Sequence, residues 1–153
     1  MMDAHTFQEN WSTLCRKFPL VCAVDLSKSS IEEMKDSIKP LCVHFDHVVI
    51  ATKNLSQEDL KEFCSLERII NLTCFRNSDV SGNTIEEKIG QILKGQMILV
   101  LSKVNTVNSH ARWRIYDKVK EMKSPLTDVI SLDSHFQYCN DQNKSFAVKL
   151  RLS

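Results

Sequence analysis

Oxygen-bearing side chains suited to a divalent cation occur at two points along the chain. An aspartate and two serines are spaced as DxSxS directly after the apolar run 20–24, and a threonine ends the SGNT tetrapeptide at 81–84. Carboxylate and hydroxyl oxygens are hard ligands of the kind that Mg²⁺ prefers. The candidate metal ligands are Asp25, Ser27, Ser29 and Thr84. The alternative interpretation is that Asp25 and Ser27 only cap a helix that starts near Ile31.

Cationic and aromatic side chains alternate between residues 103 and 123. Nucleic acid is contacted by such mixtures, but Asp117 and Glu121 dilute the positive charge here, so nucleic acid is disfavoured as a partner. Exposed Trp, Tyr and Arg side chains also anchor protein interfaces. We predict a protein-binding stripe on Arg112, Trp113, Tyr116 and Lys120. Two alternatives are a solvated helix face and a Trp113 that packs in the core near Trp11.

The elements that would position these residues alternate between strand and helix. Short apolar runs predict strands at 20–24, 47–51, 68–75, 97–101 and 128–132. Apolar residues at helical spacing predict helices at 31–41, 57–66, 85–93 and from 109 onward. This alternation predicts a three-layer, Rossmann-like α/β fold with a mostly parallel central sheet and helices on both faces. We also predict a β-hairpin within 136–152, because a polar stretch there separates two β-like stretches.

The length of 153 residues predicts one domain, which we assign to 18–153, with 1–17 as an N-terminal lead-in. Functional residues of an open α/β sheet lie at the carboxyl ends of its strands. Asp25 directly follows the first predicted strand. We therefore expect the candidate metal ligands at that edge of the sheet.

Composition excludes several classes of protein. The chain has 20 Lys and Arg against 19 Asp and Glu, so its net charge gives no argument for nucleic acid or a membrane surface. Its 3 glycines lack the spacing of a phosphate loop, which disfavours a P-loop nucleotidase and a dinucleotide-binding oxidoreductase. The 6 cysteines have no CxxC spacing, and neither a signal peptide nor a membrane span is evident. We expect reduced cysteines and a location in the cytoplasm or the nucleus.

The DxSxS motif followed later by Gly-x-Thr resembles the metal-ion-dependent adhesion site of von Willebrand factor A domains, over roughly residues 20–132. The resemblance implies a von Willebrand A-like fold, with Asp25, Ser27, Ser29 and Thr84 at the metal-ligand positions. Members that bind metal usually carry Thr-Asp-Gly after the central strand, where this chain has Ser102, Lys103 and Val104. The acidic ligand is thus replaced, so the resemblance implies a degenerate site that binds Mg²⁺ weakly or not at all, and a protein without a cofactor.

A narrower resemblance is to the von Willebrand A-like scaffold subunits of the BRISC and nuclear DNA-damage deubiquitinase complexes. It rests on Asp-Leu-Ser at 25–27, the serine and lysine at 102–103, the helix-like 116–123 and the strand-like 128–132. The resemblance implies a non-catalytic scaffold or adaptor that binds other protein subunits of an intracellular, ubiquitin-related complex. We therefore predict that the protein is not an enzyme.

The alternative function is a metal-dependent, nuclease-like hydrolase. It would use Asp25 together with other carboxylates gathered at one edge of the sheet. The candidate carboxylates are Asp25, Asp46, Asp79, Asp128 and Asp133. Spatial convergence separates the two functions, because a nuclease needs several carboxylates at that edge and a scaffold does not.

Overall fold

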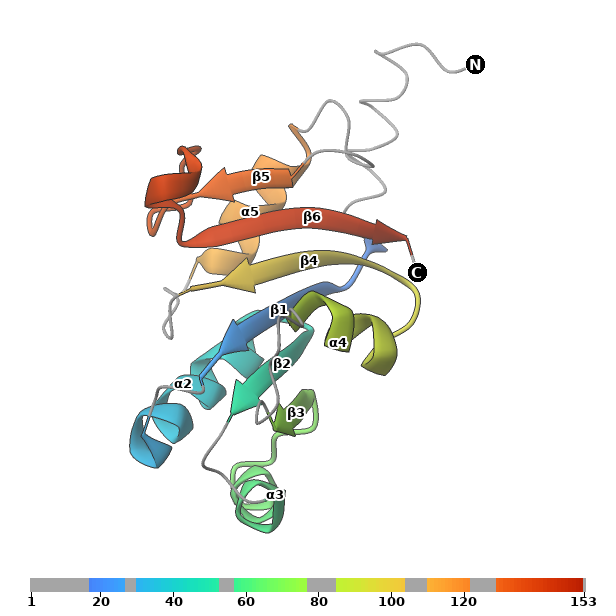
Figure 1. Ribbon diagram of the computed structural model, residues 1–153, viewed down its shortest axis with the longest axis vertical. Helices are drawn as coiled ribbons and strands as arrows, with labels where there is room; N and C mark the ends of the chain where they lie inside the picture. The colour runs from blue at the N-terminus through green and yellow to red at the C-terminus, as the bar shows by residue number, and fades with distance from the viewer. Residues whose placement is uncertain are drawn as a thin grey trace.

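The computed structural model describes residues 17–26, 30–52, 57–76, 85–103, 110–121 and 129–152. Its centre is a six-stranded sheet with the strand order β3-β2-β1-β4-β6-β5 (Figure 1). The strands are β1 (Leu20–Asp25), β2 (His47–Thr52), β3 (Leu72–Arg76), β4 (Gln96–Ser102), β5 (Val129–Leu132) and β6 (Phe146–Leu152). β1 to β4 are parallel to one another, whereas β6 runs antiparallel to both of its neighbours. The prediction of a mostly parallel sheet is confirmed.

In the described part of the chain, four α-helices form the outer layers of the three-layer fold. They are α2 (Ile31–His44), α3 (Gln57–Leu66), α4 (Ile85–Ile92) and α5 (Ala111–Val119). In Figure 1, α4 lies in front of the sheet, and α2 and α5 lie behind it. Two separate apolar clusters match this arrangement, because Ile89 of α4 belongs to one of them, and Ile38 and Ile115 of α2 and α5 belong to the other. The described chain is therefore a Rossmann-like α/β domain.

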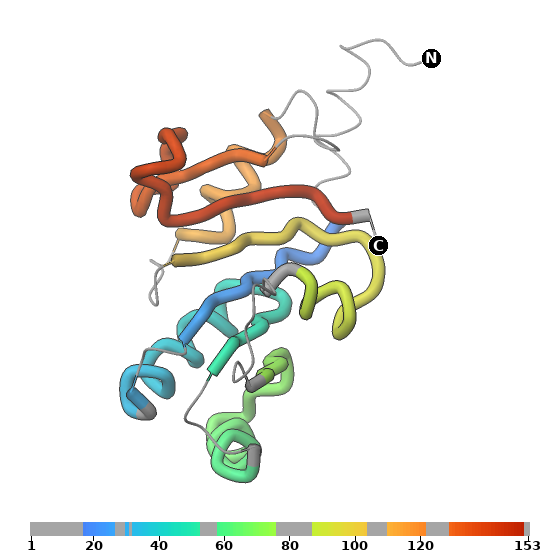
Figure 2. The backbone as a smooth tube through the Cα atoms, viewed as in Figure 1, coloured from blue at the N-terminus to red at the C-terminus, as the bar shows by residue number. Residues whose placement is uncertain are grey.

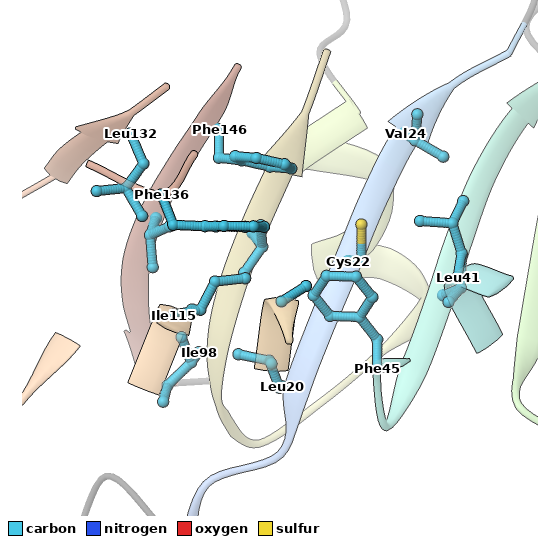
Figure 3. Close-up of a cluster of buried hydrophobic side chains, with 14 of the residues drawn as sticks. Leu20, Cys22, Val24, Leu41, Phe45, Ile98, Ile115, Leu132, Phe136 and Phe146 are labelled. Atoms are coloured by element: carbon cyan, nitrogen blue, oxygen red, sulfur yellow. The ribbon is translucent and has the colours of Figure 1, made fainter. Parts of the chain in front are cut away.

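The central strands β1, β2 and β4 form because their sequences are nearly continuous runs of Val, Ile, Leu and Ala. Such runs suit strands that are covered on both faces. Leu20, Val48 and Ile98 face the cluster under α2 and α5, whereas Val21 and Leu99 face α4. The larger cluster is drawn in Figure 3, in which the Phe136 and Phe146 rings stack with centroids 4.9 Å apart.

Helix α2 runs one turn beyond its predicted end at residue 41. Its start is as expected, since the Ser30 hydroxyl accepts a hydrogen bond from the Glu33 amide at 3.1 Å. Pro40 lies inside the helix rather than at its end. Proline there removes one helical hydrogen bond, but Leu41 and Phe45 on either side of the last turn are buried in the core. Their burial favours continuation of the helix past Pro40.

Two strand predictions needed correction. The run 68–75 begins as a turn, because Arg68 has φ 57° and the Ile69 amide bonds back to the Cys64 carbonyl at 2.8 Å, so β3 starts only at Leu72. A C-terminal hairpin is present, but β6 pairs with β5, which lies before the predicted range 136–152. Figure 2 shows β5 and β6 side by side at one end of the sheet. The pairing is decided by contacts across the sheet, which the local sequence does not record.

The cysteines of the described residues carry free thiols, at Cys22, Cys42, Cys64, Cys74 and Cys139. Burial raises the pKa of Cys42 to about 12 and that of Cys74 to about 11, with a smaller contribution from Cys64 in each case. Cys22 lies in the core on β1. These thiols therefore pack as small apolar side chains. No helix in the described ranges is long and apolar enough to cross a membrane.

Candidate functional site

The order of the strands places a switch point between β1 and β4. The chain moves outward from β1 through β2 to β3, and then returns to the other side of β1 to form β4. In open α/β sheets, ligands bind in the crevice beyond the carboxyl ends of the strands at such a point. The residues that end β1 and β4 are Asp25 and Ser102. The sheet therefore places the candidate site at the end of β1, where the sequence predicted it.

Asp25 and Lys103 are neighbours at this edge. Val24 pairs with Ser102 across the two strands, so Asp25 and Lys103 each lie one residue further along. The Lys103 amide donates to the Ser145 carbonyl at 2.9 Å, which continues the ladder between β4 and β6 beyond the last strand residue. Successive side chains of a strand alternate between faces. Asp25 and Lys103 therefore share the side of the sheet that α4 covers, and both are exposed.

The other predicted metal ligands, Ser27, Ser29 and Thr84, lie outside the described residues. Within the described ranges, no three His, Cys, Asp or Glu side chains gather closely enough to hold a metal ion. On the α4 side of the sheet, the described side chains at the ends of β1 and β4 are the Asp25 carboxylate and the Lys103 cation. This set does not fit a divalent cation, because one carboxylate would have to offset both the ion's charge and a lysine.

The carboxylates proposed for a nuclease do not converge. Asp46 lies at the opposite edge, where its carboxylate accepts from the amide of Leu20, the first residue of β1, at 2.7 Å. Asp133 follows β5, and its carboxylate accepts from the amides of Gln137 and His135, which lowers its pKa. Asp79 and Asp128 lie outside the described residues. The described acids therefore give no support to a carboxylate cluster.

The predicted stripe on α5 is not one continuous outer surface. Tyr116 is buried, and its hydroxyl donates to the Phe18 carbonyl at 3.0 Å. Arg112 lies over the Tyr116 ring, 5.4 Å from its centre, and pairs with Asp46 at 2.8 Å. Helix α5 thus uses these two residues to attach itself to the sheet. The placement of Tyr116 on the outside was wrong, whereas the Arg112 side chain remains 38% exposed.

The outer side of α5 carries the other two residues of the stripe. Trp113 is 69% exposed, so its assignment to the core is wrong. Lys120 forms an ion pair with Asp117 at 3.2 Å on the surface. That these residues bind a protein stays a prediction, and its test should change Trp113 alone, because Tyr116→Ala would open the core.

Sequence reasoning missed the network around Asp46. This single side chain accepts hydrogen bonds from the Leu20 amide and from the Arg112 guanidinium. It therefore joins three segments, namely β1, α5 and the turn before β2. The hydrogen bond to Asp46 is the main reason that the pKa of Arg112 is raised. The acid at position 46 lies in a polar turn. Nothing in the local sequence distinguishes it from a solvated aspartate, because its partners are 26 and 66 residues away.

A shallow cavity of about 480 Å³ lies between α2 and α3, away from the switch point. Phe63 and Pro40 are among the residues that line it, and the Lys35 ammonium lies 5.9 Å from the centre of the Phe63 ring. Its charges are mixed, since Lys39 pairs with Glu67 across it at 2.9 Å. We assign the candidate site to the switch point because the strand order, and not the presence of a cavity, locates a ligand-binding site in this fold.

Comparison with known proteins gives matches by structure only. No protein-family model and no curated protein matches the chain. The fold is similar to a mannosyltransferase from Pyrobaculum calidifontis, solved with GDP-Man and Mn²⁺, at a TM-score of 0.55 and 9% identity, over 95% of this chain and 54% of that one. S. aureus TarS 1-349 matches at a TM-score of 0.47 and 11% identity, over 86% and 47% of the two chains. The chain therefore spans about half the length of these structures.

The class of protein that this fold defines is a Rossmann-like α/β domain of the kind found in a mannosyltransferase. At 9% identity the likeness establishes the fold alone. The prediction of a non-catalytic scaffold is contradicted by this comparison, in which 95% of the chain matches the fold of a transferase rather than that of a scaffold subunit. Among the described residues, the carboxylates give the nuclease-like alternative no support either. The resemblance to von Willebrand A domains and to the deubiquitinase scaffold subunits stays a prediction, since no comparison addresses it.

Proposed function

We propose that the chain is a nucleotide-sugar-binding domain of the glycosyltransferase type, with its ligand at the carboxyl ends of β1 and β4. The observation that carries the proposal is the switch point between these two strands, where Asp25 and Lys103 stand side by side. The likeness to a mannosyltransferase solved with GDP-Man supports it. Because that likeness covers only half of the transferase, binding of the donor is the part of the activity assigned to this chain.

The side chains at the site suit the parts of a nucleotide-sugar. The Lys103 ammonium can pair with phosphate oxygens, and charge-assisted bonds of this kind are about twice as strong as neutral ones. The Asp25 carboxylate can accept hydrogen bonds from hydroxyls of a ribose or a sugar. The ligand thus meets an acceptor on β1 and a cation after β4.

The Mn²⁺ of the mannosyltransferase structure has no matching donor set among the described residues of this chain. The ends of β1 and β4 supply one carboxylate and a lysine. No part of the proposed binding depends on a metal ion.

Calorimetric titration with GDP-mannose and with UDP-glucose tests the proposal. We expect saturable binding of at least one of them, and we expect Lys103→Glu to weaken it. The matched control is Lys61→Glu, which makes the same charge change at an exposed position on α3. Absence of binding to either nucleotide-sugar would overturn the proposal, as would an equal loss of affinity in the two variants.

A further inference from the structure

We infer that this edge of the sheet binds the diphosphate of its ligand through the Lys103 ammonium and without a divalent cation. The inference rests on the proposed function and says how the same site recognises a negatively charged ligand. Its basis is the charge at the ends of β1 and β4, where one carboxylate is matched by one lysine. A diphosphate brought to this place meets a cation that is already part of the chain.

The position of Lys103 is fixed by the sheet. Its amide donates to Ser145 at 2.9 Å, and Ser102 before it pairs with Phe146 on β6. The strand end is therefore held on both sides, since Val24 of β1 pairs with the other side of Ser102. The side chain itself is exposed. A ligand at the switch point thus meets a lysine whose backbone is already ordered, at little cost in backbone entropy.

Two further acids at this end of the sheet accept hydrogen bonds in the segment between β5 and β6. The Asp133 carboxylate accepts from the His135 amide at 2.8 Å and from the Gln137 amide at 3.1 Å. Asp141 accepts from the Ser131 hydroxyl at 2.7 Å. These bonds close the turns between β5 and β6. In this part of the described chain, the carboxylate next to Lys103 is that of Asp25, and a divalent cation there would be repelled by the lysine.

The experiment measures the dissociation constants of GDP-mannose and guanosine in EDTA and in Mn²⁺. For the wild-type chain we expect the GDP-mannose constant to change by less than about twofold between EDTA and Mn²⁺, because one charge-assisted bond requires no ion. Lys103→Ala should lower the affinity for GDP-mannose at least about tenfold, which is the loss expected when a hydrogen bond to a charged group is removed. Guanosine has no phosphate, so its affinity should stay the same in this variant.

A second variant makes the inference sharper. Lys103→Asp places two carboxylates at the ends of β1 and β4, so GDP-mannose should bind it weakly in EDTA and at least about tenfold more tightly in Mn²⁺. Lys61→Ala on α3 is the matched control and should behave as the wild type does. Circular dichroism checks that each variant is folded.

The possible outcomes separate this inference from the proposed function. Wild-type binding that requires Mn²⁺ would overturn the role of Lys103 and leave the nucleotide-sugar site in place. Binding that is equally tight in Lys103→Ala would also overturn it. If the wild type binds no nucleotide-sugar in either buffer, the proposed function fails and this inference fails with it.

Discussion

Charged side chains have different roles at the amino ends and at the carboxyl ends of the parallel strands. We call these two sides of the sheet the amino edge and the carboxyl edge. At the amino edge, Asp46 accepts from the Leu20 amide at 2.7 Å and from Arg112 at 2.8 Å. Close by, the Asn71 amide group donates to carbonyls at the end of α2. At the carboxyl edge, Asp25 and Lys103 are exposed at the switch point. The amino edge therefore contributes to stability, and the carboxyl edge is the place at which a ligand can compete for charged groups.

The difference teaches that a charged residue in this fold cannot be assigned a role from its type alone. Arg112 and Lys103 are both cations close to strands, yet Arg112 is held by Asp46 and by its contact with Tyr116. Substitutions at the amino edge should therefore change the free energy of unfolding, and substitutions at the carboxyl edge should change the affinity for a ligand. Each prediction below perturbs contacts at the amino edge and asks whether that separation holds.

The largest effect is expected for Asp46→Ala. The change removes a carboxylate that joins the start of β1 to α5. Hydrogen bonds to charged groups contribute about 1.5–3 kcal/mol, so the free energy of unfolding should fall by about 2 kcal/mol. Urea denaturation measures the fall, and the affinity for GDP-mannose should not change in the folded variant.

The control for this change is Asp117→Ala, which removes a surface ion pair with Lys120 at the end of α5. Exposed pairs contribute about 0–1 kcal/mol, so this variant should stay close to the wild type. Equal losses in the two variants would show that the Asp46 network is no more than a surface ion pair.

A smaller effect is expected for Tyr116→Phe. The ring stays in the core, but the bond from its hydroxyl to the Phe18 carbonyl is lost. One neutral hydrogen bond contributes about 1 kcal/mol to the free energy of unfolding. Tyr138→Phe is the control at a more exposed place, where the hydroxyl donates to the Lys118 carbonyl and to the Glu121 carboxylate, at 3.1 Å in each case. A stability loss in Tyr138→Phe as large as that in Tyr116→Phe would contradict the special role of the buried contact.

The smallest effect is a dependence of stability on pH through His47. Burial lowers the pKa of this histidine below its usual 6.5, and its ring nitrogen lies 2.7 Å from the Thr73 hydroxyl. The unfolded chain therefore takes up the proton more readily than the folded one. The stability that neutral His47 provides is complete above pH 6.5 and is lost as the pH falls through that value toward the lower pKa of the folded state.

Urea midpoints at about pH 7.5 and about pH 5.5 measure this loss, since the two values bracket the ordinary titration of histidine. His47→Gln keeps a polar group beside Thr73 but has no proton to gain in this range. The midpoint should therefore change less with pH in this variant than in the wild type. An identical change would place the pH dependence in another group.

The local sequence determined most of the elements. Helix α3 occupies 57–66 as its apolar spacing predicts, and β1, β2 and β4 lie within one residue of their apolar runs. The position of Asp25 at the carboxyl edge also followed, since a residue after a strand of a parallel sheet must lie there. These features depend on propensity and periodicity over a few residues, which the sequence displays directly.

Only the tertiary structure decided which elements meet and which side chains face inward. Antiparallel β6 inserts between β4 and β5, Pro40 stays inside α2, and Tyr116 turns toward Phe18, which is 98 residues away. Each outcome is set by burial and hydrogen bonds between distant segments, and these override local preference. The same holds at the candidate site, where Lys103 stands next to Asp25 because β4 returns to the side of β1.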